Sequence, residues 1–328
     1  MTGYVLRRIL QAIPTILGIT IISFAIVQLA PGDPIDIIMF DPSFTAEDKA
    51  NMRHALCLDR SLPEQYVIWL MGDFQGECQM RGILRGDFGT SFFDKRPVLT
   101  LFLERIPATL ELTAVSLLFG GSIGLILGIL SAVKRASLFD NIIRFFSVIF
   151  DALPQFWFGI ILIMFFSVQL GWLPVGGRLP LNKADITVLD RIRHLAMPAF
   201  VLSIGWIALM SRFMRAEILE VIRQDYIRTA KAKGLKPSVV YFKHAARNAL
   251  ISIVTILGPA ITALITGAVV IERIFSWPGM GRLTVDAVAA RDYPIVMASI
   301  IFGSFIVILG NMLSDFLLVV VDPRIRLQ

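Results

Sequence analysis

Long stretches without a charged residue alternate with short charged segments along this chain. Six such mostly apolar stretches are residues 9–30, 112–133, 152–177, 195–211, 248–271 and 293–314. A helix needs about 20 apolar residues to cross the roughly 30 Å hydrocarbon core of a bilayer, and these stretches approach or exceed that length. Backbone groups must satisfy one another in lipid, so such stretches form helices. The pattern therefore predicts an all-α membrane protein with six transmembrane helices.

Two alternatives do not fit this pattern. A soluble protein with buried core helices would carry charged outer faces on them, yet only 17% of the 328 residues are charged and none lies in the six stretches. Arg7 and Arg8 resemble the start of a secretory signal, but the apolar stretch that follows is too long and ends in a poor cleavage site. We therefore expect a retained first transmembrane helix within residues 1–31.

Basic residues are concentrated in one set of the connecting segments. If both termini are cytoplasmic, the cytoplasmic segments carry a large excess of Lys and Arg, above all in residues 212–247, whereas the opposite segments are nearly balanced. Positive charge accumulates on the cytoplasmic side of membrane proteins, so we expect this orientation. The formal net charge of +6 then belongs to one face of the membrane and does not indicate a nucleic-acid partner.

One long connection, residues 32–106, lies on the external side in this orientation. It mixes Pro, Gly and Asp with short amphipathic segments, and it contains both cysteines of the chain, Cys57 and Cys78. The external side of a bacterial membrane is oxidising, which favours a disulfide between them. Two unrelated small buried residues are the equally weighted alternative. Residues 107–328 then form the main helical core.

The second apolar stretch contains glycines at close helical spacing. Gly124 and Gly128 are four residues apart, so they lie on one face of a helix. A pair of this kind lets a second helix approach closely, and we expect a close helix contact on this face.

The most informative connection is the basic segment at residues 212–247. Its composition is helical, and Gly234 marks the end of a short helix. Tyr226, Ile227 and Ala230 give that helix a modest apolar face. Such a face must be buried against something. Either lipid headgroups cover it, or it docks into a groove on a partner protein.

Motifs along most of the chain resemble those of one transporter family. Asp225–Gly234 resembles the cytoplasmic coupling loop of binding-protein-dependent ABC import permeases, in the form used by the dipeptide and oligopeptide branch. Other stretches that match this branch, in order and at sensible spacing, are Arg7–Leu10, Leu29–Pro34, Leu58–Tyr66, Arg85–Ser91, Arg105–Leu112, Glu272–Gly281, Arg291–Pro294 and Asp322–Arg326. Each match alone is weak, but together they make the resemblance specific.

The chain departs from the family pattern in three places. The general family has a glutamate and two alanines where this chain has Arg228, Thr229 and Ala230, a change that the peptide branch shares. Cys57 stands where the family usually has glycine, and an extra stretch lies around residues 72–82. The first departure leaves open any role of the glutamate in other permeases. The other two concern the external loop.

The resemblance implies a type I importer permease of the MetI-like fold in a bacterial or archaeal plasma membrane. Such a subunit is not an enzyme and binds no cofactor. A second homologous permease and two cytoplasmic ATPase subunits would complete the membrane complex, the ATPases would use ATP and Mg²⁺, and an external binding protein would deliver the peptide. The chain has no phosphate-binding loop of its own. The residues implied to contact an ATPase are Asp225, Tyr226, Ile227, Arg228, Thr229, Ala230, Lys231, Ala232, Lys233 and Gly234.

Two polar pairs lie within or beside the apolar stretches. Asp151 and Gln155 are four residues apart and flank Pro154, and Asn311 and Asp315 have the same spacing near the other end of the chain. An ionisable group in a membrane helix is costly unless it is paired or faces water. These four residues either line the peptide path or fix helix packing through hydrogen bonds, and we favour packing.

Other functions are considered within the family and outside it. Relatives in this branch move nickel, glutathione or oligosaccharides, and the membrane subunit alone discriminates these substrates poorly. An intramembrane enzyme would need a catalytic set that the sequence lacks, and a secondary carrier usually shows more spans or an internal repeat. The histidines His54, His194 and His244 share no ligand spacing, which argues against a metal site.

Overall fold

The computed structural model describes residues 2–29, 35, 45–73, 76, 78, 81–180 and 185–321. Within these residues every regular element is a helix, apart from one isolated bridge between Thr90 and Pro97. The predicted all-α class is confirmed for this part of the chain.

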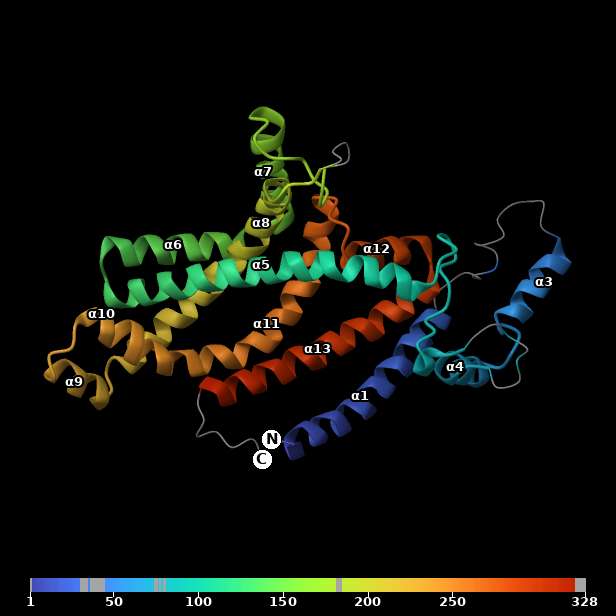
Figure 1. Ribbon diagram of the computed structural model, residues 1–328, viewed down its shortest axis with the longest axis horizontal. Helices are drawn as coiled ribbons and strands as arrows, with labels where there is room; N and C mark the ends of the chain where they lie inside the picture. The colour runs from blue at the N-terminus through green and yellow to red at the C-terminus, as the bar shows by residue number, and fades with distance from the viewer. Residues whose placement is uncertain are drawn as a thin grey trace. The chain divides into compact units, whose positions relative to one another are not determined.

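The chain divides into two compact units, whose α-helices are labelled in Figure 1. The first, called the core unit, comprises Ala108–Gly281 and Val307–Gln328 together with Met1–Tyr4. The second, called the insert unit, comprises Val5–Pro107 and Arg282–Ile306. Most of the first helix therefore groups with the external insert expected from the sequence, as does a short segment near the C-terminal end.

Among the described residues, four helices are long and apolar enough to cross a membrane: α1 (Thr2–Leu29), α5 (Val98–Val133), α8 (Val188–Val221) and α13 (Tyr293–Val321). They contain the second, fourth and sixth stretches expected from the sequence and all but the last residue of the first. α11 (Ala246–Ile274) covers the fifth, but the side chains in its middle lie outside the described residues. Six membrane helices therefore remain a prediction; in the described part of the chain, four helices have the length and composition of a span, or five if the bent pair described next is one span.

The bounds predicted for the third membrane helix, residues 152 and 177, are both wrong. The helical part of this region begins earlier, with α6 (Leu138–Ala152), continues after Pro154 as α7 (Gln155–Leu162), and finishes in a π-helix, η2 (Ile163–Gln169). The segments before and after the break differ in direction by 100° and make a fifth candidate span if they count as one. A proline lacks the backbone N–H and disfavours helix in the residue before it, which places the break here.

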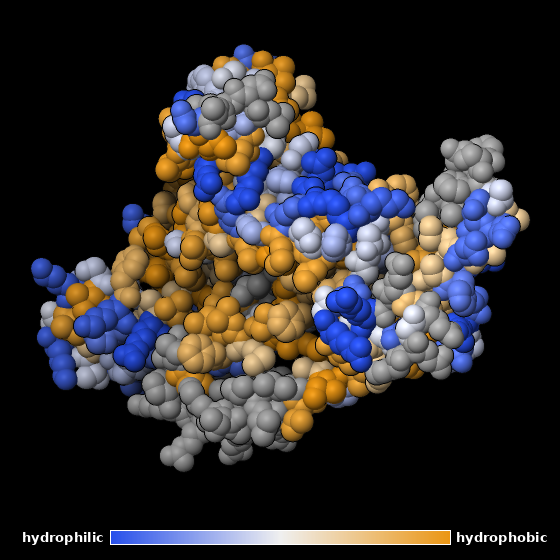
Figure 2. Space-filling model, turned by 45° about the vertical axis from the view of Figure 1, so that its right-hand side comes forward, coloured by the Kyte–Doolittle hydropathy of each residue, from blue (hydrophilic) through white to orange (hydrophobic). Residues whose placement is uncertain are grey.

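Helix α6 turns polar residues inward and apolar residues outward. Its buried residues are Asp140 and Ser147, whereas Leu138, Phe145 and Val148 are 76%, 62% and 61% exposed. Apolar side chains also cover much of the surface seen in Figure 2. A large exposed apolar surface is unfavourable in water, so this surface fits a protein solvated by lipid. The uncharged stretches did not include α6 because it carries Asp140, Arg144 and Asp151, of which only Asp140 is buried.

Helices α5 and α8 approach each other closely in the core unit. A Cβ atom built on Gly124 would lie 2.7 Å from Met210 Cβ, and one built on Gly128 would lie 2.7 Å from Met214 Cβ. Both distances are shorter than real Cβ contacts, so only glycine fits at these positions without a shift of α8. The close helix contact predicted from the glycine spacing is confirmed.

The insert unit is built on α1. The ring of Tyr66 lies 5.5 Å from that of Phe24, and the Tyr66 hydroxyl shares a 2.9 Å hydrogen bond with the hydroxyl of Thr20. These contacts fix one short helix of the insert against the first membrane helix. The short helix that carries Tyr66 is α4 (Leu62–Met71). The unit also contains α3 (Ala46–Ala55), the 3₁₀-helix η1 (Ile83–Arg85), most of α12 (Met280–Ala290) and the N-terminal parts of α5 and α13.

Candidate functional site

The basic segment between α8 and α11 contains the short helix predicted from the sequence. This helix, α9, spans Asp225–Ala232. Gly234 has a φ of +73°, and its N–H donates to the carbonyl of Lys231. A glycine in this left-handed conformation ends a helix, so the predicted end is confirmed. The chain then returns through α10 (Pro237–Val239) and a π-helix, η3 (Val240–Ala245).

The apolar face of α9 is covered by the chain itself. Ile227 is 0% exposed and Ala230 is 7% exposed, and both join a hydrophobic cluster with Ile218 of α8 and Val240 of η3. Tyr226 packs against the same cluster. The expectation that lipid headgroups or a partner protein would bury this face is therefore wrong. The covering surface forms only when the chain returns along η3, which the local pattern could not show.

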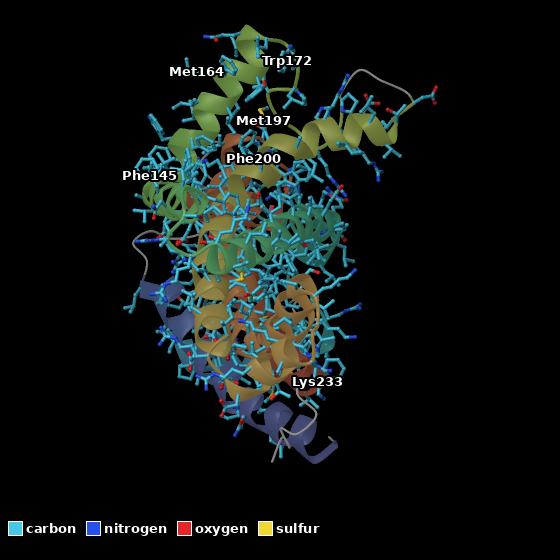
Figure 3. All side chains as sticks on the ribbon, turned by 90° about the vertical axis from the view of Figure 1, so that its left-hand side faces the viewer. Phe145, Met164, Trp172, Met197, Phe200 and Lys233 are labelled. Carbon is cyan, nitrogen blue, oxygen red and sulfur yellow. A yellow bond between two sulfur atoms is a disulfide. The ribbon has the colours of Figure 1, made fainter. Side chains whose placement is uncertain are left out.

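The opposite face of α9 is polar and exposed. Asp225 and Arg228 form an ion pair with an N–O distance of 3.3 Å, and their side chains are 92% and 76% exposed. Thr229 and Ala232 are also exposed, and Lys233 lies at the lower end of the core unit in Figure 3. An exposed ion pair contributes about 1 kcal/mol at most. This face is thus held loosely by its own contacts and is open to another molecule.

A buried ion pair joins α6 to α8. Arg215 donates from Nε and Nη2 to the two carboxylate oxygens of Asp140, at 2.7 and 2.8 Å. The Asp140 side chain is 0% exposed and also accepts hydrogen bonds from the Ser131 hydroxyl and the Ala136 N–H. Ala136 has a φ of +62°, which is unfavourable for alanine, so the carboxylate holds a strained turn. Sequence reasoning missed this pair, because its members are far apart in the chain.

A second ion pair on the same two helices is exposed. Arg212 Nη2 donates to Asp151 Oδ2 at 2.9 Å, and the two side chains are 35% and 53% exposed. The hydroxyls of Ser147 and Ser211, 3.0 Å apart, add a third contact between α6 and α8. The sequence grouped Asp151 with Gln155, which begins α7. The structure gives Asp151 a different partner, an arginine that the sequence placed in the cytoplasmic connection.

The other predicted polar pair lies on α13. Asn311 is exposed and Asp315 is partly buried. Between them, Ser314 is buried and its hydroxyl donates to the carbonyl of Val254 in α11, at 2.6 Å. This contact shows that a polar side chain on this turn of α13 takes part in helix packing. A role of the pair in a peptide path remains a prediction.

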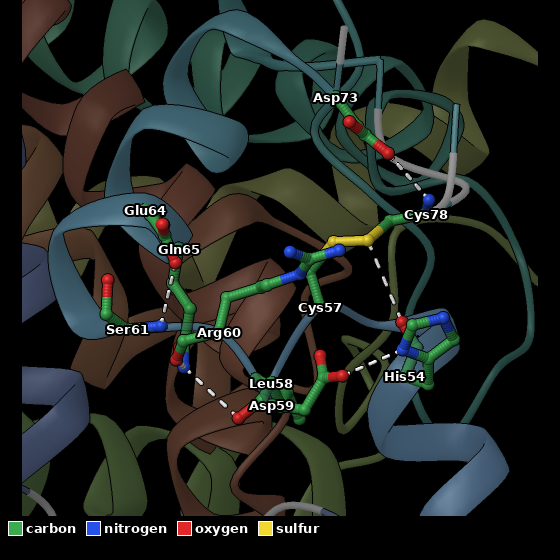
Figure 4. The surroundings of a disulfide bond; sticks show 10 residues. All are labelled: His54, Cys57, Leu58, Asp59, Arg60, Ser61, Glu64, Gln65, Asp73 and Cys78. Carbon is green, nitrogen blue, oxygen red and sulfur yellow. Dashed lines mark hydrogen bonds and ion pairs between the residues drawn. A yellow bond between two sulfur atoms is a disulfide. The ribbon is translucent and has the colours of Figure 1, made fainter. Parts of the chain in front are cut away.

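The two cysteines are joined in the insert unit (Figure 4). Cys57 and Cys78 form a disulfide with a Cα–Cα distance of 5.8 Å, in the usual range for such bonds. Beside it, the His54 ring shares a 2.7 Å hydrogen bond with Asp59, which lowers the pKa of that carboxyl. Asp73 is also close enough to the two sulfur atoms to form a metal-ligand set among the described residues, but the disulfide engages both sulfurs.

Comparison with known proteins identifies the family of the chain. Residues 124–327 match the family described as "Binding-protein-dependent transport system inner membrane component", and residues 1–113 match its N-terminal companion family. The chain is 44% identical to an oligopeptide transport system permease protein, AppB, of Bacillus subtilis, over 99% of this chain and 100% of that one. It is 41% identical to the di/tripeptide transport system permease protein DppB of Pseudomonas aeruginosa, over the full length of both.

The fold also has a solved counterpart. A chain of the MetNI methionine ABC transporter, in an inward-facing conformation, superposes with a TM-score of 0.52 at 20% identity. The match covers 68% of this chain and 97% of that chain. The resemblance to ABC import permeases drawn from the motifs is therefore confirmed by two family models and by full-length relatives. This chain belongs to the family of binding-protein-dependent transport system inner membrane components.

Proposed function

We propose that this chain is a membrane permease subunit of an ATP-driven importer of peptides. The observation that carries the proposal is the full-length similarity to permease proteins of oligopeptide and di/tripeptide transport systems, at 44% and 41% identity. Several apolar helices of membrane-spanning length support it. Import of nickel, glutathione or an oligosaccharide by the same architecture is the alternative, and competition by these compounds in a peptide-uptake assay tests it.

The proposed complex contains partners that supply what this chain lacks. A second homologous permease would complete the path, two cytoplasmic ATPase subunits would use ATP and Mg²⁺, and an external binding protein would deliver the peptide. This chain would be a non-catalytic subunit of a plasma membrane, with six spans, both termini cytoplasmic and residues 32–106 outside. To drive the switch between two permease conformations nearly to completion, the ATPases must favour one of them by about 5 kcal/mol.

Helix α9 is proposed as the element through which the ATPases shift the permease toward one conformation. Burial of Ile227 and Ala230 ties it to α8 and η3, so a displacement of α9 moves those helices with it. Its contact surface for an ATPase would be the exposed face with Asp225, Arg228 and Thr229. A groove that fits this face would carry an acidic group for the guanidinium, because that group is exposed and only weakly paired.

The structure also selects the variant that tests this role. Ala230→Asp would place a charge in the hydrophobic cluster and disturb folding, so a loss of transport would be ambiguous. Arg228→Glu changes only the exposed face, and Arg135→Glu makes the same change of charge on the exposed turn between α5 and α6. We expect Arg228→Glu to lose co-purifying ATPase and peptide uptake, and Arg135→Glu to keep both. Normal uptake with Arg228→Glu would remove α9 from this role.

A further inference from the structure

The exposed ion pair of Asp151 and Arg212 lies at the break in the bent span. Asp151 is the last residue but one of α6, and Pro154 and the start of α7 follow immediately. It lies eleven residues after Asp140, or roughly 16 Å further along the helix. The charged pair is therefore placed between the two halves of this candidate span and not at its ends.

A half-exposed ion pair at this position cannot face lipid. Hydrocarbon offers no hydrogen-bond partner to a carboxylate or a guanidinium, and charged groups within membrane spans face water or other polar groups. The outward side chains of α6, such as Phe145 and Val148, provide the lipid-facing surface instead. The face that carries Asp151 and Arg212 must therefore meet water, substrate or protein.

The neighbouring pair shows what a purely structural ion pair looks like in this protein. Asp140 is 0% exposed, is held by two bonds from Arg215, and accepts further bonds from a hydroxyl and a backbone N–H. Asp151 is 53% exposed, and one bond from Arg212 is recorded for it. Both groups of the exposed pair thus keep free hydrogen-bonding capacity. Packing alone does not require such an arrangement.

We infer that Asp151 and Arg212 form a transient binding site for the charged ends of a short peptide on its way through the membrane. The carboxylate of Asp151 would take the peptide ammonium group, and the guanidinium of Arg212 would take the peptide carboxylate. This inference rests on the proposed peptide import. It adds Arg212 to the predicted path and gives Asp151 a defined ligand chemistry.

The pair is suited to transient binding because the exchange is balanced. While no peptide is present, the two side chains neutralise each other at 2.9 Å. When a zwitterionic peptide enters, each side chain exchanges its partner for a group of the same charge, so no charge is left unpaired. A site that gains little net free energy binds weakly, and weak binding is what a transport path needs for release.

Access to water and peptide can be measured with a cysteine at the neighbouring Gln155. Both native cysteines are bonded, so the introduced thiol is the reactive one in this chain. The complex with its ATPases and binding protein is reconstituted in vesicles and labelled with a cationic thiosulfonate during turnover. We expect Gln155→Cys to react about tenfold faster than Phe145→Cys, and alanylalanine to slow that reaction about fivefold. Equal rates, or no protection by the dipeptide, would overturn the inference.

The role of the charges is tested in the same assay. Asp151→Asn or Arg212→Gln, combined with Gln155→Cys, should abolish protection by alanylalanine while the melting temperature stays near that of the parent. Ser147→Ala in the same background removes only a contact between helices and should keep protection. If protection survives in the two charge variants, the pair serves packing or a contact with the second permease, and the inference is wrong.

Uptake of alanylalanine by the parental complex distinguishes a failure of the proposed peptide import from a failure of the proposed binding site. If the parental complex takes up no alanylalanine, the proposed dipeptide import is refuted together with the binding site. If it takes up the dipeptide but the thiol at position 155 is never protected, only the binding site is refuted.

Discussion

The contrast between the two ion pairs leads to a quantitative prediction for Arg215→Met. The substitution keeps an unbranched apolar stem but leaves the carboxylate of Asp140, at 0% exposure, without its two bonds from the guanidinium. Bonds from a hydroxyl and a backbone N–H remain, and they cannot neutralise the charge. The same change at Arg212 leaves Asp151, whose side chain is 53% exposed and can be hydrated.

The expected magnitudes differ several-fold. Removing one member of a buried ion pair costs about 3–5 kcal/mol, because the other charge stays buried and uncompensated. An exposed pair is worth about 1 kcal/mol or less. At roughly 2–4 °C in the melting temperature for each kcal/mol, Arg215→Met should lower the melting temperature by roughly 10 °C and Arg212→Met by about 3 °C or less.

Thermal unfolding of the purified complex in detergent, followed by intrinsic tryptophan fluorescence, measures both variants; this chain has five tryptophans to report on it. The double variant Asp140→Leu with Arg215→Met removes both charges and should recover part of the loss, since replacing a buried pair by apolar groups is often neutral. The recovery stays partial because the Ser131 hydroxyl and the Ala136 N–H lose their acceptor. If Arg215→Met has the same melting temperature as the parent, or if the double variant melts no higher than Arg215→Met, the buried pair is not what holds α6 to α8.

Three further changes test other contacts. Gly124→Leu should cost about 1–3 kcal/mol, and Gly124→Ala less, because an added Cβ would lie 2.7 Å from a side-chain carbon of α8; the melting temperature measures both. Cys57→Ser should cost the insert about 3 kcal/mol and expose Cys78 to alkylation, whereas alkylation of both thiols in unreduced parental protein would contradict the disulfide. The pKa of Asp59 is lowered by its hydrogen bond to His54, so this contact stabilises the insert above about pH 4 and is lost as the pH falls further. In a series of urea-unfolding measurements at acid pH, the free energy of unfolding should therefore depend less on pH in Asp59→Asn than in the parent.

The sequence by itself determined the features that depend on local pattern. Uncharged stretches located α1, α5, α8 and α13, because every face of such a helix can be solvated by lipid or by another helix. Gly234 marked the end of α9, because the conformation that stops a helix is a property of one residue. The spacing of Gly124 and Gly128 predicted a close contact, although not the helix that makes it.

Tertiary structure decided the features that depend on partners distant in the chain. α6 contains three charged residues, so the uncharged stretches could not include it, and the burial of Asp140 depends on Arg215, which lies on another helix. Helix α9 was predicted, but the surface that covers its apolar face was not, because that surface is supplied by η3 and α8. A buried charge needs a partner of opposite charge and an apolar face needs a surface that covers it, and several parts of the chain could supply either one. Which residues act as that partner or that covering surface is decided only when the chain folds and brings them within contact distance.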